Sequence, residues 1–167
     1  MSYTLEALAA DIRATLKKDA GPTGKATVTE YVSRALLDQA FVAKHLTAAN
    51  CAPRKVLFED PELGFCICGH VNDDKAVGKP HDHGSSWAIY GQAVGTTEMT
   101  DWKIIRKGES EAPSLVEPVR TYVMKPGDCQ VYDVGFVHSP NRQAPTKLIR
   151  IEGANLDNVK RSHIKAA

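Results

Sequence analysis

The sequence predicts a mainly β fold, a sandwich or barrel of short strands that follows an N-terminal helical arm. After Pro53 the chain consists of short β-branched and apolar runs, interrupted by Gly, Pro, Asn and Asp. Before Pro53, apolar residues recur at spacings of three and four, which is the period of an amphipathic helix. The length of 167 residues suits a single domain with a substantial core.

Two helices are expected in the arm. The first covers residues 4–19, with Thr4 as its N-cap and Gly21-Pro22 beyond its end, and its buried face carries Leu5, Leu8, Ile12 and Leu16. A turn or short linker is expected at residues 21–25. The second helix is expected over residues 27–45, before the break at Asn50–Pro53. We assign residues 1–50 to the helical arm and residues 51–167 to the β-barrel, within a single structural domain.

Eight strands are expected in the body of the chain. They cover residues 54–58, 63–71, 85–95, 97–106, 119–124, 128–132, 136–138 and 146–152. Many short strands without helices between them are typical of a sandwich or barrel. The polar residues after Gly153 are expected to fray.

Composition excludes several classes of function. The formal net charge is +1, from 21 basic and 20 acidic residues, so we expect no nucleic-acid partner. No apolar run reaches the length of a membrane span, and Asp11 and Arg13 interrupt the apolar positions that a signal peptide would need. We therefore expect a cytoplasmic protein with no membrane partner.

The four cysteines do not form the pattern of a disulfide framework. Cys51 and Cys129 stand alone, and Cys66 and Cys68 lie two apart in an apolar run, on one face of a strand. A zinc cluster would need a second pair of ligands at short spacing. We expect reduced cysteines in the core.

Three histidines are the strongest candidates for a metal site. His81 and His83 flank one residue, so on an extended segment both imidazoles point to the same side. The third ligand is expected to be His138, which is far in sequence but can be adjacent across a barrel. Three imidazoles suit iron, nickel, copper or zinc better than magnesium or calcium. A His-x-His pair can also be structural or simply exposed.

Two segments resemble the motifs of the cupin superfamily. Gly78-Lys79-Pro80-His81-Asp82-His83 is similar to the first motif, and residues 127–141 are similar to the second. The second segment keeps Gly127-Asp128, Gly135 and His138, but it has Asp133 where the motif usually has Pro. The resemblance implies a cupin double-stranded β-helix, or jelly-roll, barrel behind the helical arm.

Within the cupins, the chain resembles the thiol dioxygenases, which are cysteine dioxygenase and 3-mercaptopropionate dioxygenase. Most cupins place a Glu ligand a few residues after His-x-His, but residues 84–90 contain no carboxylate. The resemblance implies Fe(II) held by three histidines, with Ni, Zn, Cu or Mn as the alternative metals. It also implies a small-molecule substrate, such as a thiol carboxylate, and O2.

The resemblance assigns a substrate-binding role to Arg54. In the family, an arginine on an early strand clamps the substrate carboxylate, and Arg54 occupies the matching place. A guanidinium group presents a planar fork that suits a carboxylate. The alternative is a surface arginine at the start of a strand.

The late strand departs from the family pattern. Thiol dioxygenases carry Ser-x-His-x-Tyr there, whereas this chain has Leu148, Arg150 and Glu152 on one strand face. If that face is the barrel interior, Arg150 and Glu152 should form an ion pair, because buried unpaired charges are costly. The pair could bind a polar or anionic substrate, or it could be a structural salt bridge.

The sequence thus predicts a metal-dependent dioxygenase with catalytic candidates Arg54, Arg150 and Glu152. Tyr90, Gln92 and Tyr132 are weaker candidates for hydrogen bonds near the metal. A cupin enzyme of another reaction type and a non-enzymatic metal-binding or ligand-binding cupin stay open as alternatives. The helical arm could pack against a second copy of the chain to form a homodimer.

Overall fold

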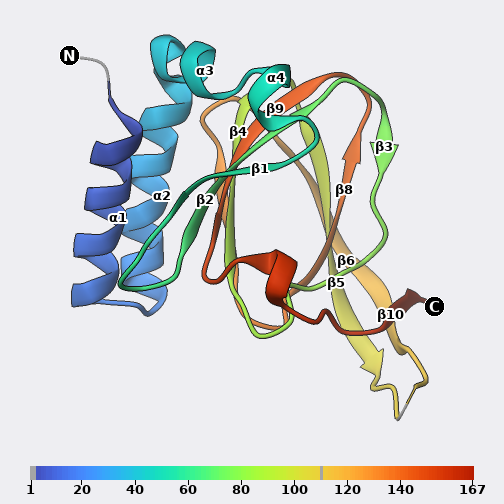
Figure 1. Ribbon diagram of the computed structural model, residues 1–167. Coiled ribbons are helices and arrows are strands. Elements are labelled where there is room, and N and C mark those ends of the chain that lie inside the picture. The colour runs from blue at the N-terminus through green and yellow to red at the C-terminus, as the bar shows by residue number, and fades with distance from the viewer. Residues whose placement is uncertain (1–2, 110) are drawn as a thin grey trace.

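The computed structural model describes residues 3–109 and 111–167 as a helical layer packed on a two-sheet β-barrel (Figure 1). The helices are α1 (Leu5–Lys18), α2 (Pro22–Leu37), α3 (Gln39–His45) and α4 (Ala48–Cys51). The strands are β1 (Lys55–Glu59), β2 (Cys66–Asn72), β3 (Ala76–Val77), β4 (Ala88–Val94), β5 (Thr97–Arg106), β6 (Ser114–Met124), β7 (Cys129–Tyr132), β8 (Val137–Arg142), β9 (Thr146–Glu152) and β10 (Ile164–Ala166).

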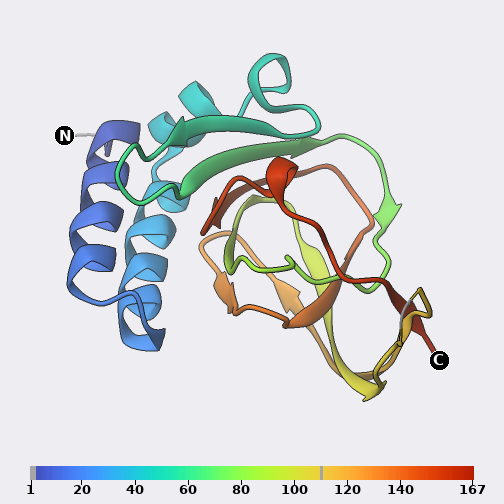
Figure 2. The ribbon, with the colours of Figure 1, turned by 60° about the horizontal axis from the view of Figure 1, so that its bottom comes forward.

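The strands form two five-stranded sheets. The first has the order β1-β2-β9-β4-β7 and the second has the order β10-β6-β5-β8-β3. Neighbours in each sheet are mostly distant in sequence, so successive strands alternate between the two sheets in several places. The turned view shows the two sheets enclosing an interior, with the C-terminal segment crossing one end (Figure 2).

The main apolar core lies outside the barrel, between the helices and the first sheet. Both views place α1 and α2 along the outer face of this sheet (Figures 1 and 2). Leu8 and Ile12 of α1 and Val32 of α2 share one fully buried cluster with Ile89 and Ile151 of the sheet. Burial of this much apolar area is the dominant favourable term in folding.

The interior of the barrel is more polar. On β9 the side chains alternate, so Ile149 and Ile151 face the helices while Arg150 and Glu152 are buried on the opposite side. A small apolar cluster of Tyr90, Met99, Met124, Tyr132 and Ala88 fills part of this interior. The barrel therefore buries charged groups that must find partners inside it.

The helical arm differs from its prediction in two places. Residues 21–25 are not a linker, because α2 begins at Pro22, a residue that the first helical position accepts readily. The single helix predicted over 27–45 is interrupted at Asp38, whose carboxylate accepts hydrogen bonds from the backbone of Ala40 and Phe41 and begins α3. The first predicted helix, at 4–19, is confirmed as α1, with Thr4 as its N-cap.

The strand prediction is wrong mainly at element ends. β6 begins at Ser114 rather than 119, β8 continues to Arg142 rather than ending at 138, and β3 was not predicted. The tail was predicted to fray, but residues 164–166 form β10 and pair in parallel with residues 114–116 of β6. These errors share a cause, because each segment is fixed by a partner strand and has little pattern of its own.

None of the helices in residues 3–109 and 111–167 has the length and apolar character that crossing a bilayer would need. The four cysteines are free thiols, as predicted, and three of them are buried.

Candidate metal centre

His81, His83 and His138 come together inside the barrel. His81 and His138 lie opposite each other because their backbones exchange two hydrogen bonds of 3.0 Å. His83 lies two residues further along the same segment, on the same side. The candidate ligand atoms of the three side chains lie within 4.8 Å of one another. The three histidines therefore form a group that could hold a metal ion.

Burial keeps these imidazoles neutral. His83 and His138 are 0% exposed. Burial, with the nearby charge of Arg150, lowers the pKa of His83 to about 3. Burial also lowers the pKa of His138 and of His81 below their ordinary range. Neutral imidazoles have the free lone pairs that a metal ion needs.

The hydrogen bonding of the group fits a metal. His83 Nδ1 and both ring nitrogens of His138 are buried without a hydrogen-bond partner in the described part of the chain. His81 Nδ1 lies 2.9 Å from the carbonyl of Lys79, to which it can donate, leaving Nε2 with its lone pair. Buried polar nitrogens without partners are costly, and a shared cation would satisfy one nitrogen on each ring.

The donor set selects a class of metal. No carboxylate or cysteine joins the three histidines among residues 3–109 and 111–167. Nitrogen ligands suit iron, nickel, copper and zinc, and they disfavour calcium and magnesium. The residues therefore fit a divalent transition metal, without choosing one.

The C-terminal segment fastens the loop that carries His81 and His83. Asp82 accepts hydrogen bonds from the backbone nitrogen of Ser162 at 3.1 Å and from its hydroxyl at 2.5 Å. Asp82 also accepts from the backbone of Gly84 at 3.0 Å. Gly84 has a φ of +60°, and a Cβ there would lie 2.2 Å from the carbonyl oxygen of Lys160. The tail and the histidine loop are thus built against each other.

Two tyrosines line the histidine group. The Tyr132 ring stacks on His138, with centroids 3.8 Å apart, and its hydroxyl lies 2.7 Å from that of Tyr122. The Tyr90 hydroxyl lies 3.1 Å from His83 Nε2. The weaker candidates Tyr90 and Tyr132 thus lie beside the three histidines. Gln92 lies away from them, where it bonds to Thr97.

Glu152 is shared by two arginines. Arg150 donates to Glu152 Oε1 at 2.8 Å through Nε, and Arg54 donates to Oε2 at 2.8 Å through Nη2. The expected ion pair between Arg150 and Glu152 is present. Burial alone would raise the pKa of Glu152, but Arg54 and Arg150 lower it to about 2. The carboxylate is therefore held ionised.

Arg54 is not free to bind a substrate carboxylate as the family resemblance implied. Its guanidinium donates to Glu152 and also to both carboxylate oxygens of Asp157, at 3.0 and 2.9 Å. These partners come from β9 and from the segment that follows it, and no sequence pattern near Arg54 indicates them. A role as a clamp would require both carboxylates to be displaced.

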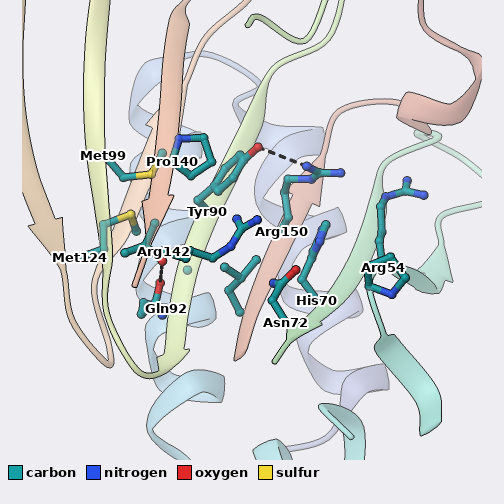
Figure 3. Close-up of a pocket in the computed structure, with 14 residues that line it drawn as sticks. Arg54, His70, Asn72, Tyr90, Gln92, Met99, Met124, Pro140, Arg142 and Arg150 are labelled. Carbon is teal, nitrogen blue, oxygen red and sulfur yellow. Dashed lines mark hydrogen bonds between the residues drawn. The ribbon is translucent and has the colours of Figure 1, made fainter. Parts of the chain in front are cut away.

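A cavity of about 200 Å³ lies beside the histidine group. Tyr90 and Arg150 form part of its wall, and Arg150 Nη1 donates to the Tyr90 hydroxyl at 3.2 Å (Figure 3). His81, His83 and His138 do not line the cavity, because Tyr90 stands between. The cavity wall also includes Arg142, which sequence reasoning missed. Arg142 lies four residues after His138 on β8, so the two side chains point to the same face. Extending the predicted strand beyond residue 138 would have placed Arg142 inside the barrel.

Comparisons with known proteins address the fold. No protein-family model matches the chain, and no curated protein matches its sequence. A protein from Klebsiella pneumoniae with a double-stranded β-helix domain is 15% identical, with a TM-score of 0.50, over 74% of this chain and 88% of that chain.

Two further solved structures are similar at lower scores. A cupin superfamily protein from Desulfitobacterium hafniense is 10% identical, with a TM-score of 0.43, over 67% of this chain and 76% of that chain. KdgF from a Halomonas species is 20% identical, with a TM-score of 0.43, over 67% of this chain and 80% of that chain. The likeness at a TM-score of 0.50 shows the fold alone, which is a double-stranded β-helix, or jelly roll, here with added N-terminal helices.

Proposed function

We propose that this cupin is a metal-dependent dioxygenase that holds non-haem iron(II) with His81, His83 and His138. The proposed reaction oxidises a small organic substrate, such as a thiol carboxylate, with O2. The supporting observation is the group of three neutral imidazoles within 4.8 Å, with buried unpaired nitrogens and, among the residues that the structure describes, no carboxylate in the group. The thiol dioxygenase branch itself is supported by the sequence resemblance.

The protein contributes binding and orientation in this proposal. Iron bound by three neutral ligands would supply the redox chemistry that lets O2 react with an organic substrate. The Tyr90 hydroxyl, beside His83, can donate or accept a hydrogen bond next to the metal. Tyr132 stacks on His138 and fixes the plane of its ring.

In the proposal, Arg150, Glu152 and Arg54 act as positioning residues. Arg150 binds the Tyr90 hydroxyl, Glu152 holds Arg150, and Arg54 holds the other oxygen of Glu152. This chain of contacts leads from the edge of the barrel to the hydroxyl that contacts His83. It takes the place of the family's Ser, His and Tyr on the late strand.

The same contacts favour one alternative. Because an ionic network stands where thiol dioxygenases place Ser-x-His-x-Tyr, the metal could serve another cupin reaction, such as a non-thiol dioxygenation or an isomerisation. The outcome of the experiment below decides between the two.

The test combines metal analysis with oxygen consumption. Purified protein loaded with iron(II) is expected to hold about one metal ion per chain and to consume O2 when small thiol acids are added. His83→Ala and His138→Ala should each remove tight metal binding and oxygen consumption. His163→Ala is the matched control, because His163 is exposed and outside the group.

Each outcome bears on a different part of the proposal. A sulfinate product from a thiol acid would support the thiol dioxygenase. A bound metal without thiol-dependent oxygen consumption would move the function to the alternative cupin reaction. Wild-type protein that binds no transition metal would overturn the proposal as a whole.

A further inference from the structure

The cavity beside Tyr90 contains an arginine without a counter-charge. Arg142 ends β8 and extends into the middle of the cavity, towards His70 and Arg150 (Figure 3). Its Nε is buried and has no hydrogen-bond partner in the part of the chain that the structure describes. Burial lowers the pKa of Arg142, yet a guanidinium group stays charged at any physiological pH. Arg142 as a whole is half-buried, but a guanidinium group with a buried nitrogen and no anion beside it is in a costly position.

The other two arginines of the cavity are already neutralised. Arg54 and Arg150 share Glu152, and Arg54 also binds Asp157, so two cations face two carboxylates. The residues that line the cavity include Arg142 but, within the described ranges, no aspartate or glutamate. The net surplus is one positive charge, which matches a ligand with one negative charge.

Polar and apolar parts of the wall lie on opposite sides. His70 Nε2 is buried without a hydrogen-bond partner in the described residues, and Asn72 lies next to it on the same strand face. Figure 3 shows Met99, Met124 and Pro140 gathered on the other side of Arg142. The cavity thus offers hydrogen-bonding groups at one end and apolar, adaptable side chains at the other.

The size of the cavity limits the ligand. A cavity of about 200 Å³ is slightly larger than one of about 150 Å³ that takes up benzene, so it suits a ligand of roughly ten non-hydrogen atoms or fewer. A planar guanidinium group pairs with a carboxylate through two parallel hydrogen bonds.

We infer that this cavity binds a small monocarboxylate, whose carboxylate is held by Arg142 beside His70 and whose short apolar part lies against Met99, Met124 and Pro140. Any role of this ligand in catalysis rests on the proposed function. Tyr90 connects the two sites, because it lines the cavity and also contacts His83. A carboxylate held there lies against the ring that separates the cavity from the histidine group. Arg142, rather than Arg54, is then the arginine that binds the carboxylate in this cavity.

Binding is tested on metal-free protein by calorimetric titration with propionate, so the result does not depend on iron or oxygen. Propionate is expected to bind, whereas the uncharged propionamide is not. Arg142→Met keeps the apolar stem and should weaken propionate binding by about 30-fold or more, because it removes one partner of a buried charge pair. Arg106→Met is the matched control, since Arg106 is exposed at the end of β5 and should leave the affinity unchanged.

A second variant and a second ligand test the same site independently. Arg142→Lys keeps the charge without the planar fork and should lose less affinity than Arg142→Met, which tests the site even if the methionine variant does not fold. Tighter binding of inorganic phosphate than of propionate would overturn the carboxylate assignment. Absence of propionate binding to the wild-type protein, or unchanged binding to Arg142→Met, would overturn the site itself. A failure of the oxygen-consumption test would leave all of these results standing.

Discussion

Glu152 illustrates how single residues hold the interior of this barrel together. It is 0% exposed, and its two oxygens accept from Arg150, from Arg54 and from the backbone of Leu156. Because side chains alternate between the two faces of a strand, residues 150 and 152 share a face, and this was enough to predict the ion pair between Arg150 and Glu152. It could not predict Arg54, because that contact joins positions at opposite ends of the barrel sequence.

Replacing Glu152 by glutamine should strongly destabilise the protein. The substitution keeps the size of the side chain but leaves Arg54 and Arg150 without the charge they share, and breaking a buried pair costs about 3–5 kcal/mol. The free energy of unfolding is measured by urea denaturation. Glu117→Gln is the control, because Glu117 and Lys103 form an exposed pair that should contribute about 0–1 kcal/mol. Similar losses in the two variants would refute the structural importance of the shared carboxylate.

At the residue level, the predicted proximity of the three histidines is present in the structure, whereas Arg142 was not predicted. The His-x-His spacing and the second motif were both local signals, and the structure brings the three side chains together. Arg142 carries no motif, and it was missed because the predicted strand ended four residues too early. Its significance comes from having no partner, which only the folded arrangement reveals.

At the scale of elements, the C-terminal segment is the part whose role was least visible in the sequence. Its residues are polar and suggest a loose tail, yet they pair with β6 and bind Asp82 between two of the histidines. Strand pairing at an edge depends on the neighbour as much as on the segment itself. By contrast, α1 and the strands with clear apolar patterns were predicted to within three residues at each end.

Gly84→Ala should separate the tail from the histidine loop. The new Cβ would meet the carbonyl oxygen of Lys160 at 2.2 Å, in addition to the cost of a left-handed backbone at φ +60°. We expect a loss of stability about 1–3 kcal/mol greater than that of Gly135→Ala, which has φ +77° and no atom within 4 Å of its Cβ. Metal affinity should fall about tenfold or more, because the neighbouring His83 loses its support.

Urea denaturation and a metal titration on the two glycine variants check this prediction. Equal losses of stability would mean that the tail moves aside without cost. An unchanged metal affinity in Gly84→Ala would mean that the tail does not help to position the histidines.

At the scale of the whole molecule, the main core and the site occupy different sides of one sheet. The helices and the outer face of the first sheet bury most of the large apolar side chains. The barrel interior lies on the other side of this sheet, and it contains Arg150 and Glu152 from the first sheet and His138 and Arg142 from the second. This division explains why the sequence revealed the fold class well. The periodicities of helices and strands both indicate which residues form the apolar face. The arrangement of the polar interior depends on contacts between the two sheets, which these periodicities do not predict.

The stability of the metal-free protein should fall in mild acid. His83 is neutral in the folded chain, with its pKa lowered from 6.5 to about 3, and burial also lowers the pKa of His138 and of His70. Below pH 6.5 the unfolded chain therefore binds more protons than the folded chain, so the free energy of unfolding decreases as pH falls. Glu152 contributes a further loss of stability at lower pH, between pH 4.5 and about pH 2, because its carboxylate must first become protonated.

Urea denaturation at several pH values between about 7 and about 5 measures this loss, at up to about 1.4 kcal/mol per pH unit for each histidine. In His83→Asn the free energy of unfolding should change less with pH, because one of the histidines that titrate on unfolding is removed. Stability that stays constant or rises on acidification would show that the histidines are charged in the folded protein.

The sharing of Glu152 between two arginines also restricts how this sequence can change over generations. Exchange of Glu152 removes the carboxylate on which both arginines depend, whereas exchange of Arg54 or Arg150 leaves Glu152 paired with the other arginine. The carboxylate is therefore the hardest of the three residues to replace on its own, and either arginine should be exchanged at a smaller cost in stability. In this barrel, substitutions on the late strand should be tolerated least at position 152.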